Sequence, residues 1–178
     1  MSAPIRSETM KIKMTPQLAY LIGVWKGRKI PRGIGIRGSG EIRETFLREV
    51  MDTLKIPPEK IQLHESEVFF YHSAYRKYFE ETEKNEVDVF KKRNKYSASY
   101  IAGMFDSCGG VEGDTPYFAR ASYKDQMFME LLGLRTRFKK GKLVVTNPSE
   151  FIVFVKDFLK HSEIKNALLR SGNERDPH

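Results

Sequence analysis

Apolar residues in this chain follow two spacings, every third or fourth position in some segments and every second position in others. From residue 41 to 54 they keep the helical spacing and stop before two prolines, which predicts a core-facing helix. Thr15 and Pro16 form a typical helix start before another apolar run. The same reasoning predicts strands at 29–38, 61–71 and 117–123, helices at 74–95, 126–134 and 147–161, and a hairpin at 135–146. This mixture indicates an α+β fold.

Two segments of the chain repeat each other eighty positions apart. Residues 18–27 read LAYLIGVWKG and residues 98–107 read ASYIAGMFDS. The matched positions carry the same or similarly small residues: Tyr20 with Tyr100, Gly23 with Gly103, and Gly27 with Ser107. Small residues every fourth position let two helices approach more closely than the usual ~8–10 Å. We therefore expect these six residues to form an interface between two paired helices.

Both segments resemble the LAGLIDADG motif of homing endonucleases, read from Leu21 in the first copy and from Ile101 in the second. The resemblance is to the single-chain form with two motifs, and it covers nearly the whole chain. It implies two pseudo-symmetric αββαββα halves packed through paired motif helices, with curved antiparallel sheets that form a saddle. The chain then divides into a first half at 15–95 and a second half at 96–170, and mixed charge at 1–14 and polar composition at 171–178 predict a mobile arm and a polar tail.

Neither motif contains the acidic residue that the family uses to bind the divalent metal ion. Arg28 occupies that position in the first copy and Cys108 in the second. Arginine is permanently cationic and has no acceptor for a metal, and a thiolate suits zinc or copper(I) rather than magnesium. We therefore expect no catalytic residue, metal or cofactor here, and a protein that binds nucleic acid without cutting it.

Acidic residues near the second motif leave an enzymatic alternative open. Asp106 stands at the sixth motif letter, and Glu112 lies in a glycine-rich turn sequence at 109–114. In this alternative they would serve a Mg²⁺-dependent endonuclease that cuts double-stranded DNA by phosphodiester hydrolysis. However, Asp106 precedes the metal position by two residues and so points roughly 200° away around the helix. The first motif ends in basic residues only, Lys26, Arg28 and Lys29.

The charge balance favours an anionic partner. The chain has 31 Lys and Arg against 23 Asp and Glu, a formal charge of +8 and a pI near 9.5. A single cysteine excludes an internal disulfide and a zinc framework. No apolar run reaches the length of a membrane span and no signal segment is visible, so we expect a cytoplasmic protein without a membrane partner. Abundant Lys, Arg and Glu beside few Asn and Gln is typical of thermophilic proteins.

The hairpin predicted at 135–146, turning at Lys140 and Gly141, has one basic and one apolar face. A ribbon of this kind can enter the major groove of DNA, although a solvated sheet face gives the same pattern. The residues expected to contact nucleic acid, taken from both halves, are Arg32, Arg37, Arg120, Lys124, Arg135, Arg137, Lys139, Lys140 and Lys142. We expect a monomer with internal pseudo-twofold symmetry that binds double-stranded DNA. The alternative partner is structured RNA, bound by an RNA binder or an intron-splicing maturase.

Overall fold

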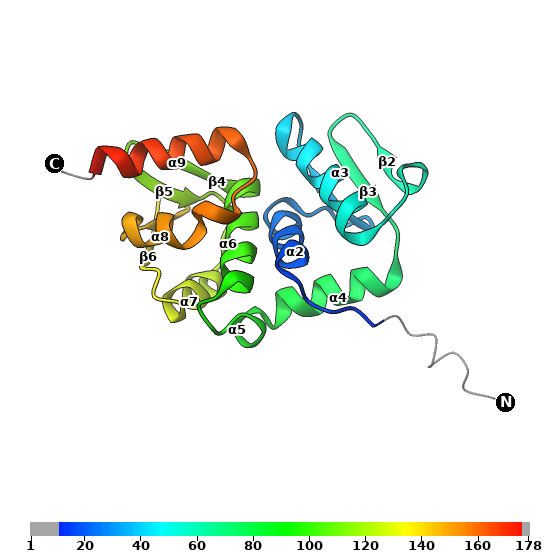
Figure 1. Cartoon of the computed structure of the whole chain (residues 1–178), viewed down its shortest axis with the longest axis horizontal. Helices are drawn as coiled ribbons and strands as arrows, with labels where there is room; N and C mark the ends of the chain where they lie inside the picture. Colours follow the sequence, from blue (N-terminus) through cyan, green and yellow to red (C-terminus); the bar gives the residue numbers. More distant parts are fainter. Residues whose placement is uncertain (1–10, 176–178) are drawn as a thin grey trace.

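The computed structural model describes residues 11–175 of the chain. Most of the arm expected at 1–14 and the last three residues of the expected tail lie outside this range. Two helices, α2 (Pro16–Arg28) and α6 (Lys95–Cys108), lie side by side at the centre, and one half of the protein is built around each (Figure 1). The predicted arrangement of two halves packed through the motif helices is confirmed.

Each half adds an antiparallel sheet and further helices to its central helix. The first half contains β1 (Ile34–Arg37), α3 (Glu41–Leu54), the short 3-10 helix η1 (Pro58–Lys60), β2 (Gln62–Leu63), β3 (Glu67–Phe70) and α4 (Ser73–Lys84). The second contains β4 (Gly109–Glu112), β5 (Thr115–Phe118), α7 (Tyr123–Leu131), β6 (Thr136–Lys139), β7 (Lys142–Val145), α8 (Pro148–Val155), η2 (Lys156–Phe158) and α9 (Ser162–Arg175). The strand orders are β1-β3-β2 and β4-β5-β7-β6, and α5 (Glu86–Val89) lies between the halves.

Local capping explains where the two central helices begin. The side chain of Thr15 accepts a hydrogen bond from the Leu18 amide at 3.1 Å, and Pro16 occupies the first turn. Asn94 and Ser97 form a capping box at the start of α6. Both helices are buried along nearly their whole length, so α2 and α6 are the core that the two halves share.

Two glycines allow the backbones of α2 and α6 to touch. A Cβ atom on Gly23 would lie 2.1 Å from the carbonyl oxygen of Tyr100, and a Cβ on Gly103 would lie 2.1 Å from the carbonyl oxygen of Tyr20. The contact is reciprocal, as expected for two repeats related by a twofold axis. Gly27 faces Ser107 one turn later, where a Cβ would clash with the Ser107 hydroxyl. The predicted interface residues therefore do meet.

The first sheet is smaller than the second because its leading strand is reduced to a single bridge. After α2, Lys29 pairs with Ile36, and the Ile30 amide donates to the Gly35 carbonyl at 3.1 Å. Pro31 then follows, which has no N–H to continue the ladder. The second half carries a complete four-residue strand, β4, at the equivalent place. The first half is thus a shortened αββαββα unit.

Several element boundaries differ from the prediction. The helix expected at 74–95 is broken: α4 ends at Lys84, where the Asn85 side chain donates to the Glu81 carbonyl at 2.9 Å, and α5 and a linker precede α6. The sequence at 109–114 is not only a turn, because β4 occupies most of it. Residues 171–175 belong to α9 rather than to a tail, and Ser171 is buried and donates to the Asp114 carbonyl.

The remaining boundaries shift by a few residues. The strand expected at 61–71 is split into β2 and β3, and the strand expected at 117–123 spans 115–118. The helix expected at 126–134 starts earlier because Ser122 caps it, in a capping box with Asp125. Within the expected arm, Ile12 and Met14 pack against the core. No helix in the range 11–175 combines the length and the apolar character needed to cross a membrane.

Replacing Gly23 or Gly103 by alanine is expected to destabilise the fold by at least about 2 kcal/mol, because the added Cβ meets backbone atoms that can move only if the helices separate. Denaturant unfolding followed by circular dichroism measures this change. Gly172→Ala in α9 is the matched control, because its Cβ would meet only the end of the Ile152 side chain. If the denaturant midpoints of Gly23→Ala and Gly103→Ala equal that of the wild type, the close approach of α2 and α6 does not require glycine at these positions.

Candidate nucleic-acid interface

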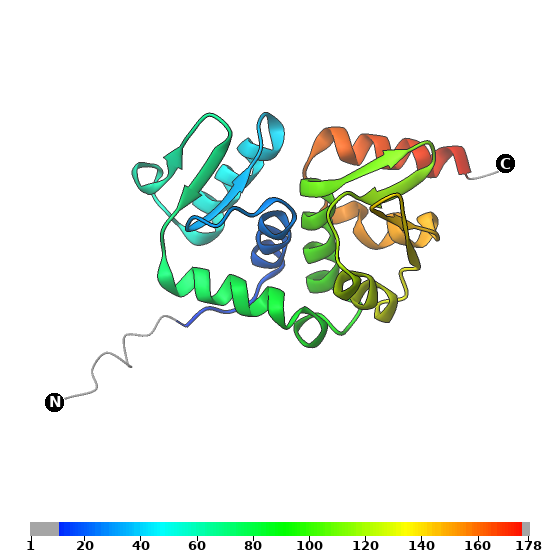
Figure 2. The same cartoon turned by 180° about the vertical axis from the view of Figure 1, so that it is seen from behind.

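The second sheet has one buried face and one open face. Phe118, Leu143 and Val145 point into the core and are fully buried. Tyr117, Val144 and Arg137 are opposite one another on the other face, as their strand register shows. Figure 2 shows this side, with the strands of the second half toward the viewer and α9 behind them. The open face of the second sheet is therefore available to a partner.

A basic hollow of about 290 Å³ lies on this open face. The residues that line it are Glu112, Thr115, Tyr117, Arg137, Lys139, Lys140, Lys142 and Val144. Lys139 and Lys142 are direct cross-strand partners, and the Nζ atom of Lys142 lies 4.3 Å from the Tyr117 ring centroid. Glu112 is its one acidic member and is 3.4 Å from Lys142. Four cations against one carboxylate give the hollow a positive potential.

The hairpin predicted from the sequence supplies the four cations of this hollow. It turns at Lys140 and Gly141, both with positive φ (51° and 80°), which matches the twist of a tight antiparallel hairpin. Arg135 is exposed just before β6, and its amide donates to the Asn147 side chain at 2.9 Å. Arg120 is exposed in the loop between β5 and α7. The structure thus places six of the nine predicted contact residues on or beside the open second sheet.

Lys124 is exposed, but its charged group is bound to the backbone of the first half. Its ammonium group donates to the carbonyl oxygens of Glu83 and Lys84 at the end of α4, the first at 3.0 Å. Cations stabilise helix C-termini because the carbonyl groups there have no helical partner. Lys124 therefore connects α7 of the second half to α4 of the first.

The two arginines predicted in the first half share one carboxylate. Arg32 and Arg37 each donate to Glu67, both at 2.7 Å, through different oxygens. The hydrogen bond from Arg37 lowers the pKa of Glu67 below its ordinary value, so this carboxylate stays charged. The Arg32 guanidinium also lies 5.1 Å from the Phe69 ring centroid. These side chains are ordered by contacts within the protein.

The two metal-ligand positions of the motif are occupied by side chains that bind the backbone. Arg28 donates from Nε to the Ser107 carbonyl at the end of α6 and from Nη1 to the Arg37 carbonyl at 3.2 Å. The Cys108 thiol is buried and donates to the Arg120 carbonyl at 3.6 Å. Burial raises the pKa of Cys108 to about 11, which disfavours the thiolate form of this side chain near pH 7.

The acids considered as substitute ligands lie apart and have other partners. Oδ2 of Asp106 accepts from the Tyr20 hydroxyl at 2.5 Å and from the amides of Lys160 and His161 at 2.8 and 3.1 Å. Burial raises the pKa of Asp106 to about 6. Glu112 is exposed in the basic hollow. In the range 11–175, no three His, Cys, Asp or Glu side chains gather in a way that would hold a metal ion.

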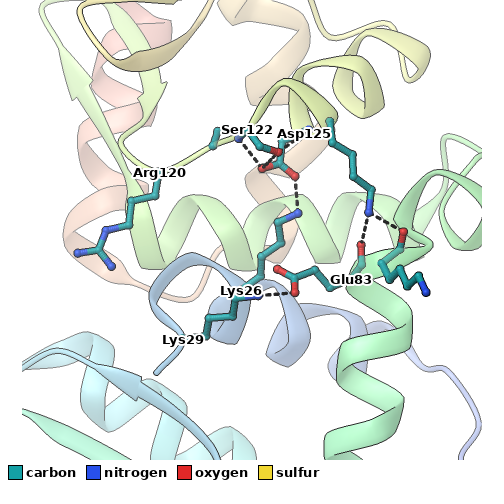
Figure 3. A pocket seen from close by; sticks show the side chains of 9 residues that line it. Lys26, Lys29, Glu83, Arg120, Ser122 and Asp125 are labelled. Atoms are coloured by element: carbon teal, nitrogen blue, oxygen red, sulfur yellow. Dashed lines mark hydrogen bonds and ion pairs between the residues drawn. The ribbon is translucent and has the colours of Figure 1, made fainter. Parts of the chain in front are cut away.

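A buried charge network at the junction of the halves was not predicted. The Lys26 ammonium lies 2.6 Å from Oε1 of Glu86 of α5 and also binds Asp125 of α7 (Figure 3). Burial lowers the pKa of Lys26, but the attraction of the two carboxylates outweighs it, and the pKa is raised overall. Burial and a hydrogen bond with Asp125 raise the pKa of Glu86 to about 8. Lys26 and Asp106 stand at the same position of the two motifs. Their opposite charges were the one feature of the sequence that could have indicated this network.

A pocket of about 390 Å³ opens beside this network. Its lining comes from both halves and consists of Lys26, Lys29, Glu83, Lys84, Arg120, Ala121, Ser122, Lys124 and Asp125. Figure 3 shows that Lys26 points at Asp125 and that Lys29 pairs with Glu83, whereas Arg120 extends away from these groups. Most of the charged groups in the pocket are thus already paired between the two halves. The pocket therefore marks a contact that stabilises the fold.

Glu86 is expected to make the stability of the protein depend on pH. Its pKa is about 8 in the folded protein against 4.5 for the ordinary group, so folding takes up a proton here between these values. The stabilisation is present at low pH and is lost as the pH rises through 8. Relative to Glu86→Gln, which stays neutral, the wild type should lose on the order of 1 to 3 kcal/mol between pH 5 and 9.

Denaturant unfolding at a series of pH values measures this difference. Glu80→Gln, on the exposed face of α4, is the control, and its profile should run parallel to that of the wild type. Parallel profiles for the wild type and Glu86→Gln would contradict the raised pKa.

Comparison with known proteins shows the fold. No family model and no curated protein matches the chain. Among solved structures, I-DmoI in complex with DNA and Ca has a TM-score of 0.62 at 13% identity, over 87% of this chain and 97% of that one. I-DmoI, a homing endonuclease by its description, has a TM-score of 0.56 in its complex with DNA and Mn, at 16% identity over 79% and 96%. The N-terminal LAGLIDADG domain of DUF199/WhiA has a TM-score of 0.55 at 14% identity, over 90% and 93%. The chain has the LAGLIDADG fold, as its repeat predicted.

Proposed function

We propose that this protein binds double-stranded DNA through the open face of its second sheet and does not cut it. The observation that carries the proposal is the basic hollow, in which Arg137, Lys139, Lys140 and Lys142 converge against a single carboxylate. Phosphate groups are spaced along duplex DNA at one charge per ~1.7 Å of axis, so a cluster of cations on one surface can contact several of them. Arg120 and Arg135 extend this surface beyond the hollow.

The geometry of the hollow favours a duplex over a small anion. The four cations of the hollow come from two adjacent antiparallel strands, β6 and β7, and their turn, and such a ribbon has the width to enter a major groove of ≈ 12 Å. Arginine at a groove can pair with guanine, and either Arg or Lys can pair with phosphate. The I-DmoI structures that share this fold contain DNA, which supports duplex DNA as the partner. Because α2 and α6 already pair within one chain, the proposed binder acts as a monomer.

The side chains at the two motif ends support the proposed absence of cutting. A guanidinium group at position 28 repels a divalent cation, and its donors are bound to two carbonyl groups. The thiol at position 108 is buried and protonated. Metal-assisted hydrolysis needs oxygen ligands that hold Mg²⁺ beside the phosphate. The two paired helices would then serve as a scaffold for binding, which is the role we propose for them.

Removing charge from the hollow is expected to weaken DNA binding. Arg137→Ala and Lys142→Ala should each lower the affinity for a random duplex several-fold and reduce the slope of log affinity against log salt by about 0.9. Fluorescence anisotropy across a salt series measures both. Arg170→Ala, which removes the same charge from α9 on the opposite side, is the control and should leave the slope unchanged. Equal effects of all three variants would contradict a localised interface. In a competition assay, displacement of the duplex by folded RNA at a lower concentration than by unlabelled DNA would favour the RNA alternative.

The wild type is expected to leave supercoiled plasmid DNA intact with and without Mg²⁺, under conditions where anisotropy shows binding. Gel electrophoresis detects a single nick per plasmid, so the assay is sensitive to weak activity. If Mg²⁺-dependent nicking occurs, the proposal of an inactive binder is wrong, and its loss in Glu112→Gln would identify that acid. Nicking gained only by the double variant Arg28→Asp, Cys108→Asp would show that the missing ligands are what prevents cutting.

A further inference from the structure

The two sheets of this protein differ in width. In the second half, β4 forms a complete edge strand paired with β5 over four residues. In the first half, the equivalent segment contributes only the Lys29–Ile36 bridge before Pro31 ends the pairing. The first sheet therefore has three strands, one of them with two residues, whereas the second has four. A narrower sheet offers fewer positions from which side chains can reach a groove.

The arginines around the first sheet are bound to other groups of the protein, although Arg32 and Arg37 are 55% and 64% exposed. Glu67 binds both Arg32 and Arg37 at 2.7 Å and is itself largely buried. Three more arginines donate to backbone carbonyl oxygens: Arg28 to Arg37, Arg43 to Glu65, and Arg76 to Pro31, at 3.2, 2.9 and 3.3 Å. A phosphate that approached Arg32 or Arg37 would have to compete with a carboxylate that is already in place. Charge-assisted pairs of this kind are stronger than neutral hydrogen bonds.

Exposed apolar side chains also distinguish the first half. Leu63 on β2 is 57% exposed and Tyr71 just after β3 is 66% exposed. Phe69, on the middle strand, packs against Tyr71 with 5.7 Å between ring centroids and lies under Arg32. Strand register places Leu63 opposite Val68, on the other face of the sheet from Phe69, so Phe69 and Tyr71 are the apolar groups on the open side. The open face of the first sheet is thus partly apolar, and its two arginines are both paired with Glu67, so it offers a polyanion less unpaired positive charge than the basic hollow does.

We infer that the protein contacts a single stretch of duplex, about one helical turn long, through its second half alone. This inference rests on the proposed function and specifies how the duplex is bound. The four cations of the second sheet supply the phosphate and groove contacts, and the first half supports the second through α2 and the Lys26 network. The mode is asymmetric, although the fold is pseudo-symmetric, because only one of its two sheets has kept a free basic surface.

Three double variants that each remove two positive charges test the inference by fluorescence anisotropy on a random duplex. Arg137→Ala, Lys142→Ala changes the second sheet and should lower the affinity at least tenfold and the salt slope by about 1.8. Arg32→Gln, Arg37→Gln changes the first sheet and should stay within about twofold of the control pair Lys165→Ala, Arg170→Ala on α9. Circular dichroism confirms that each variant is folded. A loss of affinity and slope for the first-sheet pair that equals that of the second-sheet pair would overturn the inference.

A length series of duplexes gives an independent readout with the unmodified protein. Contact through one sheet predicts that affinity, corrected for the number of overlapping positions, stops rising at about one turn, or ~10 base pairs. Contact through both sheets predicts a continued rise to about two turns, or ~20 base pairs, and would overturn the inference while leaving the proposed function intact. No binding to any duplex at low salt would overturn both, so the two failures are distinguishable.

Discussion

The backbone contact between α2 and α6 is the constraint on which the rest of this structure depends. Gly23 and Gly103 face each other's helices so closely that no side chain fits between them. Because each sheet follows directly from the end of its helix, this contact also fixes where the two sheets lie relative to each other. The two helices end side by side, so the side chains in their last turns determine the charge and the hydrogen bonds at the centre of the molecule.

The last turns of the two helices have equivalent positions with opposite charges. Asp106 is buried and accepts hydrogen bonds from Tyr20 and from the loop after α8. The ammonium of its counterpart Lys26, which is partly buried, lies 6.0 Å from the Tyr100 ring centroid and binds Glu86 and Asp125. Both groups bind their helix to elements that follow it in the chain. Arg28 of α2 binds the Ser107 carbonyl at the end of α6 and so connects the two helices. At these positions the ionisable side chains therefore strengthen the joint between the halves.

Most of the fold could be predicted from the sequence because its signals are local. Thr15 and Pro16 mark a helix start, and Lys140 and Gly141 mark a hairpin turn, with no information from elsewhere in the chain. The end of α4 at Lys84 was not predicted because the residues after it keep a helical pattern of polar and apolar positions. The hydrogen bond from the Asn85 side chain that ends the helix is visible only in the structure. The Lys26 network brings together residues from three segments far apart in the sequence. No spacing rule reveals such a site.

The same architecture explains how one half can lose features that the other keeps. The sheets are not paired with each other in any described strand ladder; each has its own strand order, and α2 and α6 carry the main contact between the halves. Shortening the strand after α2 therefore removes groove-facing positions without opening the core, since Ile34 and Ile36 stay buried against it. In a fold with one continuous sheet the same loss would expose an unpaired edge in the middle of the protein. Separate sheets on a shared helix pair let the two halves diverge in charge and width while the scaffold stays intact.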